Sequence, residues 1–247
     1  MNNLITREHF DAVLFDLDGV LTATARVHAI CWKKMFDDFL KHYSAERAED
    51  LLAFDLNKDY SLYVDGKPRY DGVQSFLESR GIQLPKGNPD ASPDENTICG
   101  LGNLKNEIFN DILRTSGAEV YEGSVALVKQ LRNQGIQTAV VSSSKNSEAI
   151  LRTAGILELF VLRLDGEIAS RLKLKGKPAP DTFLEAARQL GTEPSRVAVV
   201  EDAISGVQAA QAGGFKLVIG VDRKNDPESL RKNGADVVVT DLRELLS

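Results

Sequence analysis

The sequence predicts a doubly wound α/β core that a helical domain interrupts after the first strand. Two observations carry this prediction. From Tyr121 onwards, short apolar segments alternate with helical ones, and this alternation is the pattern that builds a parallel sheet. The short segments are apolar throughout, so we expect the strands to be buried on both faces.

The first strand is expected at Ala12–Phe15, an apolar run that ends in Asp16 and Asp18. Burying carboxylates beside a core is costly unless a cation or dense hydrogen bonding compensates. The pair therefore points to a metal site or a reacting one, and an Asp-rich turn is the plain structural alternative. A helix is expected from about Ala25, with Thr24 as its N-cap.

The remaining elements follow from periodicity and turn signals. Residues 54–119 mix helical stretches with a turn-rich segment and a proline-containing loop, which indicates a helical insert. The expected domains are 1–22 with 120–247 for the core and 23–119 for the insert. Further helices are expected at 124–132, 146–154, 180–190 and 203–212, and further strands at 138–141, 197–200, 217–219 and 237–239.

Composition excludes several classes of protein. The 247 residues are 43% hydrophobic, enough for a buried core, but no apolar stretch approaches the roughly 20 residues that span a bilayer. The N-terminus lacks a secretory signal, so we expect a cytoplasmic protein without a membrane partner. A net charge of -6 without a basic block argues against nucleic acid. Cys31 and Cys99 suit neither a disulfide framework nor a zinc site.

Polar groups follow other expected strands as well. The segment Ser142–Asn146 follows one strand, Glu201 and Asp202 end another, and Gly176–Asp181 lies between them. Active sites of doubly wound sheets lie at the carboxyl ends of the strands. We therefore expect these loops to share one edge with the two aspartates of the first strand.

Four carboxylates at one edge cannot all stay ionised without a cation, and an all-oxygen ligand set suits Mg²⁺. The predicted metal ligands are Asp16, Asp18, Glu201 and Asp202, of which Asp16 and Asp202 are expected to bind directly. With such a cation present, Asp16 is suited to attack phosphorus and form an aspartyl phosphate.

The neighbouring groups suit the same chemistry. Asp18, two residues beyond the nucleophile, is predicted to act as general acid and base. Lys177 is predicted to screen Asp16 from the charge of the phosphate, and Ser142 with nearby backbone N–H groups to hold the transferring oxygens.

These residues resemble the haloacid dehalogenase superfamily of phosphotransferases. Four motifs match in order: DLDGV at Asp16, Ser142 after a strand, Lys177 in GKPAPD, and VED at Glu201 and Asp202. The resemblance implies an α/β fold with a Rossmann-like parallel sheet core and an inserted helical cap domain. It also implies Mg²⁺ and a mobile cap.

A narrower resemblance is to the β-phosphoglucomutases and their close relatives. Thr24 and His28 resemble that group's hinge threonine and the histidine that steers its general acid. The resemblance implies catalytic roles for Asp16, Asp18, Ser142, Lys177 and His28, and substrate binding by Gly66, Arg69, Lys105, Ser144, Lys145 and Asn146. Among these, Arg69 resembles the arginine that grips the phosphate that is not transferred.

The implied reaction converts β-glucose 1-phosphate to glucose 6-phosphate through a bisphosphate intermediate. A sugar phosphate phosphatase with the same nucleophile and acid is the alternative, and a non-catalytic phosphosugar sensor is a third reading. Segments 67–102 and 165–176 look longer than in a minimal mutase, and similar variants resemble cap domains beside trehalose- or maltose-processing enzymes. The expected partner is a small-molecule sugar phosphate, and the chain is expected to be a monomer.

Overall fold

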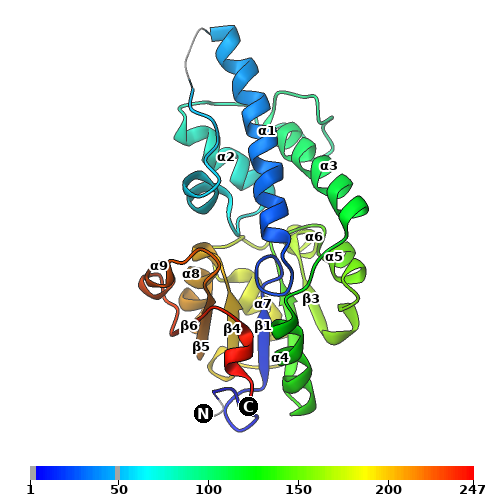
Figure 1. Cartoon of the computed structure of the whole chain (residues 1–247), viewed down its shortest axis with the longest axis vertical. Helices are drawn as coiled ribbons and strands as arrows, with labels where there is room; N and C mark the ends of the chain where they lie inside the picture. Colours follow the sequence, from blue (N-terminus) through cyan, green and yellow to red (C-terminus); the bar gives the residue numbers. More distant parts are fainter. Residues whose placement is uncertain (1–3, 48–50) are drawn as a thin grey trace. The chain divides into compact units, whose positions relative to one another are not determined.

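The computed structural model describes residues 4–47 and 51–247. The chain divides into two compact units, one built from its beginning up to Thr24 together with Ala118–Ser247, the other from Ala25–Gly117 (Figure 1). Each unit has its own hydrophobic cluster. Among the described residues, no helix combines the length and the apolar character that a membrane span requires.

The described part of the first unit holds a six-stranded sheet in which neighbouring strands are all parallel, so the predicted sheet is confirmed. Its order is β3-β2-β1-β4-β5-β6. The strands are β1 (Ala12–Phe15), β2 (Gln137–Val141), β3 (Leu162–Leu164), β4 (Val197–Glu201), β5 (Leu217–Val221) and β6 (Val237–Val239). The order reverses between β1 and β4, which is where open α/β sheets bind ligands.

The helices of this unit are α4 (Glu122–Asn133), α5 (Ser147–Thr153), α6 (Gly166–Arg171), α7 (Asp181–Gln189), α8 (Ile204–Ala212) and α9 (Pro227–Lys232). Periodicity did not predict β3, α6 or α9, because elements of three to six residues carry too little pattern. Capping signals mark both helices: Asp165 accepts from two N–H groups of α6, and Asp226 caps α9 with Pro227 following.

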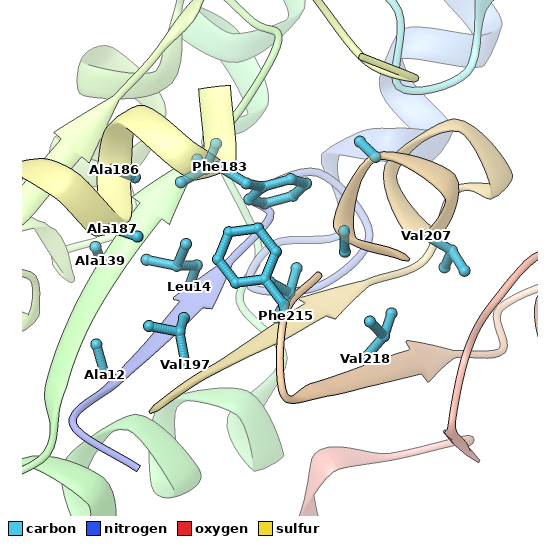
Figure 2. Packing of buried hydrophobic residues seen from close by; sticks show 14 of the residues in the cluster. Ala12, Leu14, Ala139, Phe183, Ala186, Ala187, Val197, Val207, Phe215 and Val218 are labelled. Carbon is cyan, nitrogen blue, oxygen red and sulfur yellow. The ribbon is translucent and has the colours of Figure 1, made fainter. Parts of the chain in front are cut away.

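The sheet is buried on both faces, as its apolar strands predicted. All four residues of β1 are buried, and alternate side chains point to opposite faces. Figure 2 shows Phe183 of α7 and Phe215 on the face of Leu14 and Val197, with the two rings in an edge-to-face contact at 6.0 Å. Small residues such as Ala186 let α7 lie close to the strands.

The second unit is helical. Its elements are α1 (Thr24–Arg47), α2 (Arg69–Ser79), α3 (Ile98–Ser116) and a π-helical turn at Tyr60–Val64. The core is aromatic: the ring of Phe36 lies 5.4, 5.3 and 4.0 Å from those of Trp32, Phe54 and Phe76. Thr24, predicted as the N-cap, is the first residue of α1 instead, one position further into the helix.

Candidate active site

The site in the first unit begins where β1 and β4 end. Phe15 pairs with Val200, and the backbone N–H of Asp16 donates to the Val200 carbonyl at 2.9 Å. This register places Asp16 beside Glu201, the last residue of β4. Both side chains are buried, although an apolar strand precedes each of them. The parallel pairing therefore brings together two acids that are 185 residues apart.

Lys177 joins these two acids. Its ammonium nitrogen lies 2.5 Å from Asp16 Oδ1 and 2.5 Å from Glu201 Oε1, and it donates to the carbonyl of Val141 at 3.2 Å. Burial by itself would lower the pKa of Lys177, but the charges of the two carboxylates outweigh it and raise the pKa. The same nitrogen lies 5.0 Å from the ring centre of Phe183, so the site rests directly on the core in Figure 2.

The acids outnumber the lysine. Burial raises the pKa of Asp16, and although Lys177 opposes that rise, the charges of Glu201 and Asp18 add to it. One carboxylate oxygen from each of Asp16, Glu201 and Asp202 lies within 4.8 Å of the others, and all three residues are buried. A hard, all-oxygen donor set with excess negative charge fits a divalent cation. The cluster is thus suited to hold a metal ion.

Glu201 is held firmly in place. Its Oε2 accepts from the backbone N–H groups of Asp202 and Ala203 at 3.1 and 3.2 Å, while Oε1 accepts from Lys177. Gly206 of α8 lies directly beneath, because a Cβ there would come within 1.9 Å of Oε1. The glycine is needed for this close approach, and the carboxylate has little freedom to move.

Asp18 lies in the turn that follows β1. Its half-buried carboxylate accepts from the hydroxyl of Thr24, which also contacts Thr22 Oγ1 at 2.6 Å. Asp18 is not part of the three-acid group within 4.8 Å. The next residue, Gly19, has a φ of +93°, and a Cβ there would meet Asp202 Oδ2 at 1.9 Å. Only glycine fits this turn.

The serine loop after β2 reaches the same edge of the sheet. The N–H of Ser142 donates to the Leu164 carbonyl at 3.0 Å, and its Oγ accepts from the N–H of Ser144 at 3.1 Å. Ser144 Oγ accepts in turn from the N–H of Asn146 at 3.1 Å. Lys145 is exposed. This loop therefore leads into α5 in a shape that the serine hydroxyls hold.

In the second unit, His28 and Lys105 meet. Lys105 is buried, its ammonium contacts His28 Nδ1, and it lies 5.0 and 5.1 Å from the ring centres of Trp32 and Phe109. The imidazole of His28 stacks on Phe109 with ring centres 4.0 Å apart. Helix α3 thus places Lys105, predicted as a substrate-binding residue, among aromatic rings.

Arg69 lies at the start of α2, three residues after Gly66, whose φ is +69°. Its guanidinium donates to Asn106 Oδ1 at 2.7 Å. Burial lowers the pKa of Arg69. Gly102 of α3 makes room for this contact, since a Cβ there would lie 3.2 Å from Arg69 Cδ and 2.7 Å from the ring of Tyr70. The predicted site residues omitted Asn106, although it directly follows Lys105.

A family model described as haloacid dehalogenase-like hydrolase matches residues 10–214. A β-phosphoglucomutase of Mycobacterium bovis is 47% identical over 242 residues, which are 97% of this chain and 92% of that protein. The β-phosphoglucomutase of Bacillus subtilis is 30% identical over 95% of this chain and 91% of its own length. The crystal structure of a Clostridium difficile β-phosphoglucomutase aligns with a TM-score of 0.73 at 25% identity, covering 96% and 93% of the two chains.

Proposed function

Because the chain belongs to the haloacid dehalogenase superfamily, in its β-phosphoglucomutase-like subfamily, we propose that it converts β-glucose 1-phosphate to glucose 6-phosphate. The observation that carries this proposal is the buried contact of Asp16 with Lys177 at the reversal point of the sheet. A carboxylate in that place is shielded from water and paired with a fixed cation, which suits a nucleophile that must approach an anionic phosphate.

In this mechanism a carboxylate oxygen of Asp16 bonds to phosphorus while the bond from phosphorus to the sugar oxygen breaks. Asp18 gives its proton to the departing oxygen. In the reverse transfer, Asp18 takes the proton of the other sugar hydroxyl, which then accepts the phosphoryl group from Asp16. Two such transfers through a sugar bisphosphate move the phosphate from C1 to C6 and regenerate the aspartyl phosphate.

The surrounding groups handle charge. Lys177 offsets the carboxylates of Asp16 and Glu201, and the proposal gives Ser142 and backbone N–H groups of its loop the role of binding the transferring oxygens. The proposed cation is Mg²⁺, held by Asp16, Glu201 and Asp202, with Asp18 as the fourth predicted ligand. When bound, it neutralises phosphoryl oxygens.

The proposed cation has a test that does not depend on turnover. A ligand that binds only the folded state stabilises it by about 2.7 kcal/mol at 100 times its Kd. We expect Mg²⁺ to raise the melting temperature of the wild-type protein and to leave that of Asp202→Asn almost unchanged. Asp38→Asn, on the exposed face of α1, is the control and should keep the wild-type shift.

We assign the phosphate that is not transferred to the second unit. Arg69 and Lys105 supply the positive charge for this phosphate. Lys105 also contacts His28, the histidine of the family motif. Arginine pairs with a phosphate through two parallel N–H bonds, which also fixes the orientation of the sugar.

The deciding experiment incubates the protein with Mg²⁺, β-glucose 1-phosphate and a trace of glucose 1,6-bisphosphate, and follows glucose 6-phosphate and free phosphate in parallel. Glucose 6-phosphate without matching free phosphate supports the mutase. Free phosphate alone supports the second candidate, a sugar phosphate phosphatase, which the hydrolase description of the family model favours. Asp16→Asn should be silent in both assays and still bind the sugar phosphate, whereas a non-catalytic sensor would show no wild-type turnover.

A further inference from the structure

Arg223 contacts the turn that follows β1, although 204 residues separate it from Gly19 in the chain. It follows β5, and its Nε donates to the carbonyl of Gly19 at 2.8 Å. A second nitrogen of the same guanidinium donates to the Thr240 carbonyl at 3.0 Å. Gly19 directly follows Asp18, so the arginine is bonded to the Gly19–Val20 peptide, the second peptide unit after the predicted general acid.

The flat face of the guanidinium also contacts an aromatic ring. Its central carbon lies 3.6 Å from the ring centre of Tyr121, which is a close stacking contact. The backbone N–H of Tyr121 donates to the Leu21 carbonyl at 3.0 Å, two residues beyond Gly19. Arg223 and its aromatic neighbour thus hold the same turn at two points.

The turn has little other freedom. Gly19 is buried, its N–H donates to the Thr22 carbonyl at 2.8 Å, and its Cα is pressed against the Asp202 carboxylate. Removing the charged donor would leave the buried Gly19 carbonyl without this hydrogen bond, and a small rotation of the Gly19–Val20 peptide toward another partner would relieve that cost in free energy. Such a rotation would change the backbone angles of Gly19, and through this neighbouring residue it would shift the Asp18 side chain.

We infer that Arg223 is a positioning residue, which holds the Gly19 carbonyl, and with it the turn after β1, so that the Asp18 carboxylate stays in line for proton transfer. The inference rests on the proposed function, because it assigns to Asp18 the proton of the sugar oxygen. Displacing a reacting group by about 1 Å costs up to about 100-fold in rate. Lysine offers a donor but not the planar fork, so it would restore the turn only in part.

The test compares a sugar phosphate donor with two activated phosphate donors. β-Glucose 1,6-bisphosphate, the sugar that phosphorylates Asp16 in the proposed cycle, has a leaving oxygen that needs a proton, whereas the leaving groups of 4-nitrophenyl phosphate and acetyl phosphate do not. The rate of Asp16 phosphorylation is measured in single turnovers for wild type, Arg223→Ala and Arg223→Lys. The control is Arg196→Ala, which removes a guanidinium that bonds to Asp11 and to a backbone carbonyl elsewhere in the same unit.

We expect Arg223→Ala to slow phosphorylation by the sugar phosphate at least about tenfold, to change KM little, and to leave the rate with the activated donors within about threefold. Arg223→Lys should lie between this variant and wild type, and Arg196→Ala should change neither rate. Equal slowing with both kinds of donor, an unchanged sugar phosphate rate, or the same pattern in Arg196→Ala would each overturn the inference.

Failure of the proposed function would look different. Wild type would then react with the activated donors but not with β-glucose 1,6-bisphosphate, and the comparison would be repeated with whichever sugar phosphate wild type accepts. If wild type reacts only with sugar phosphates, kcat and KM of Arg223→Ala are compared with those of wild type. A fall in kcat at constant KM supports the positioning role, and a rise in KM alone overturns it.

Discussion

Each unit of the protein buries a lysine, and the two lysines are held in different ways. Lys177 in the first unit lies 2.5 Å from each of two carboxylates at the end of the sheet. Lys105 in the second unit contacts an imidazole nitrogen and lies about 5 Å from the centres of two aromatic rings. Both side chains are almost inaccessible, so burial does not distinguish them.

The surroundings do distinguish them. Removing one partner of a buried ion pair costs about 3–5 kcal/mol, whereas a cation over a ring gains about 0.5–2 kcal/mol. Lys177 is therefore part of the framework that makes the acidic cluster foldable. The weaker aromatic attraction at Lys105 is one that an arriving phosphate can exceed. The comparison shows that two equally buried lysines can be held by different forces, by carboxylates at Lys177 and by aromatic rings and an imidazole at Lys105, and binding of a phosphate by Lys105 is part of our proposal.

The largest effect is expected from Asp16→Asn, which removes one of the two acids that face Lys177 as well as the nucleophile. Phosphoryl transfer should fall by at least about 1,000-fold, because an amide oxygen does not form the phosphoenzyme. Quenched-flow measurement of phosphoenzyme from β-glucose 1,6-bisphosphate checks this, with Asp38→Asn as the control. Residual transfer within tenfold of wild type would show that another group is the nucleophile.

Lys177→Met should lower both the stability of the folded protein and its activity. It leaves Asp16 and Glu201 facing each other, and we expect a loss of about 3–5 kcal/mol in unfolding free energy by urea titration, with reduced transfer from every donor. The pKa of Lys177 is raised on folding, so this contribution is fully present below the ordinary lysine pKa of 10.5 and is lost only as pH rises through the higher folded value. A stability difference that vanishes at neutral pH would contradict the ion-pair account.

Lys105→Met makes the same chemical change in the second unit and is the matched partner of Lys177→Met. We expect a stability loss of no more than about 2 kcal/mol, because rings accommodate a methionine well. KM for β-glucose 1-phosphate should rise about tenfold, and transfer from 4-nitrophenyl phosphate should stay the same. If both lysine variants lost stability equally, the distinction between the two units would be wrong.

Asn106→Ala should also raise KM for β-glucose 1-phosphate, but by less than Lys105→Met. It removes the acceptor that holds the Arg69 guanidinium at 2.7 Å, so Arg69 must be ordered when the phosphate binds. We expect KM for β-glucose 1-phosphate to rise about threefold with kcat unchanged. Asn110→Ala, on the exposed face of the same helix, is the control for helix stability.

The smallest effect belongs to an exposed ion pair at the other end of β1. Hydrogen bonds from Arg196 and Arg7 lower the pKa of Asp11 to about 2. The folded pKa lies below the ordinary 3.8, so the contribution is present above pH 3.8 and is lost as pH falls through about 2. Wild type should therefore exceed Asp11→Asn in urea midpoint at pH 6, by an amount that water screening keeps small, and the gap should close in acid. A gap that widened in acid would contradict this sign.

Sequence patterns were most informative for elements in which several residues show the same apolar periodicity. The buried strands of the sheet, the helices that alternate with them and the helical insert were all visible as apolar periodicity, since each involves several side chains facing one core. The short elements β3, α6 and α9 were not visible, because their formation depends on sheet pairing and on single capping residues. Thr24 was expected to cap α1, but it is the first residue of the helix and its hydroxyl donates to Asp18.

The sequence by itself determined which chemistry is available: the acids, the lysine and the serine at strand ends follow from local pattern and from the order of the motifs. Only the tertiary structure decided which of them meet, because parallel pairing places Glu201 beside Asp16 and folds Lys177 between them. It also decided the contacts of Lys105 with His28, of Arg69 with Asn106 and of Arg223 with Gly19. These are side-chain contacts between residues 37 to 204 positions apart, and no local pattern encodes such distances.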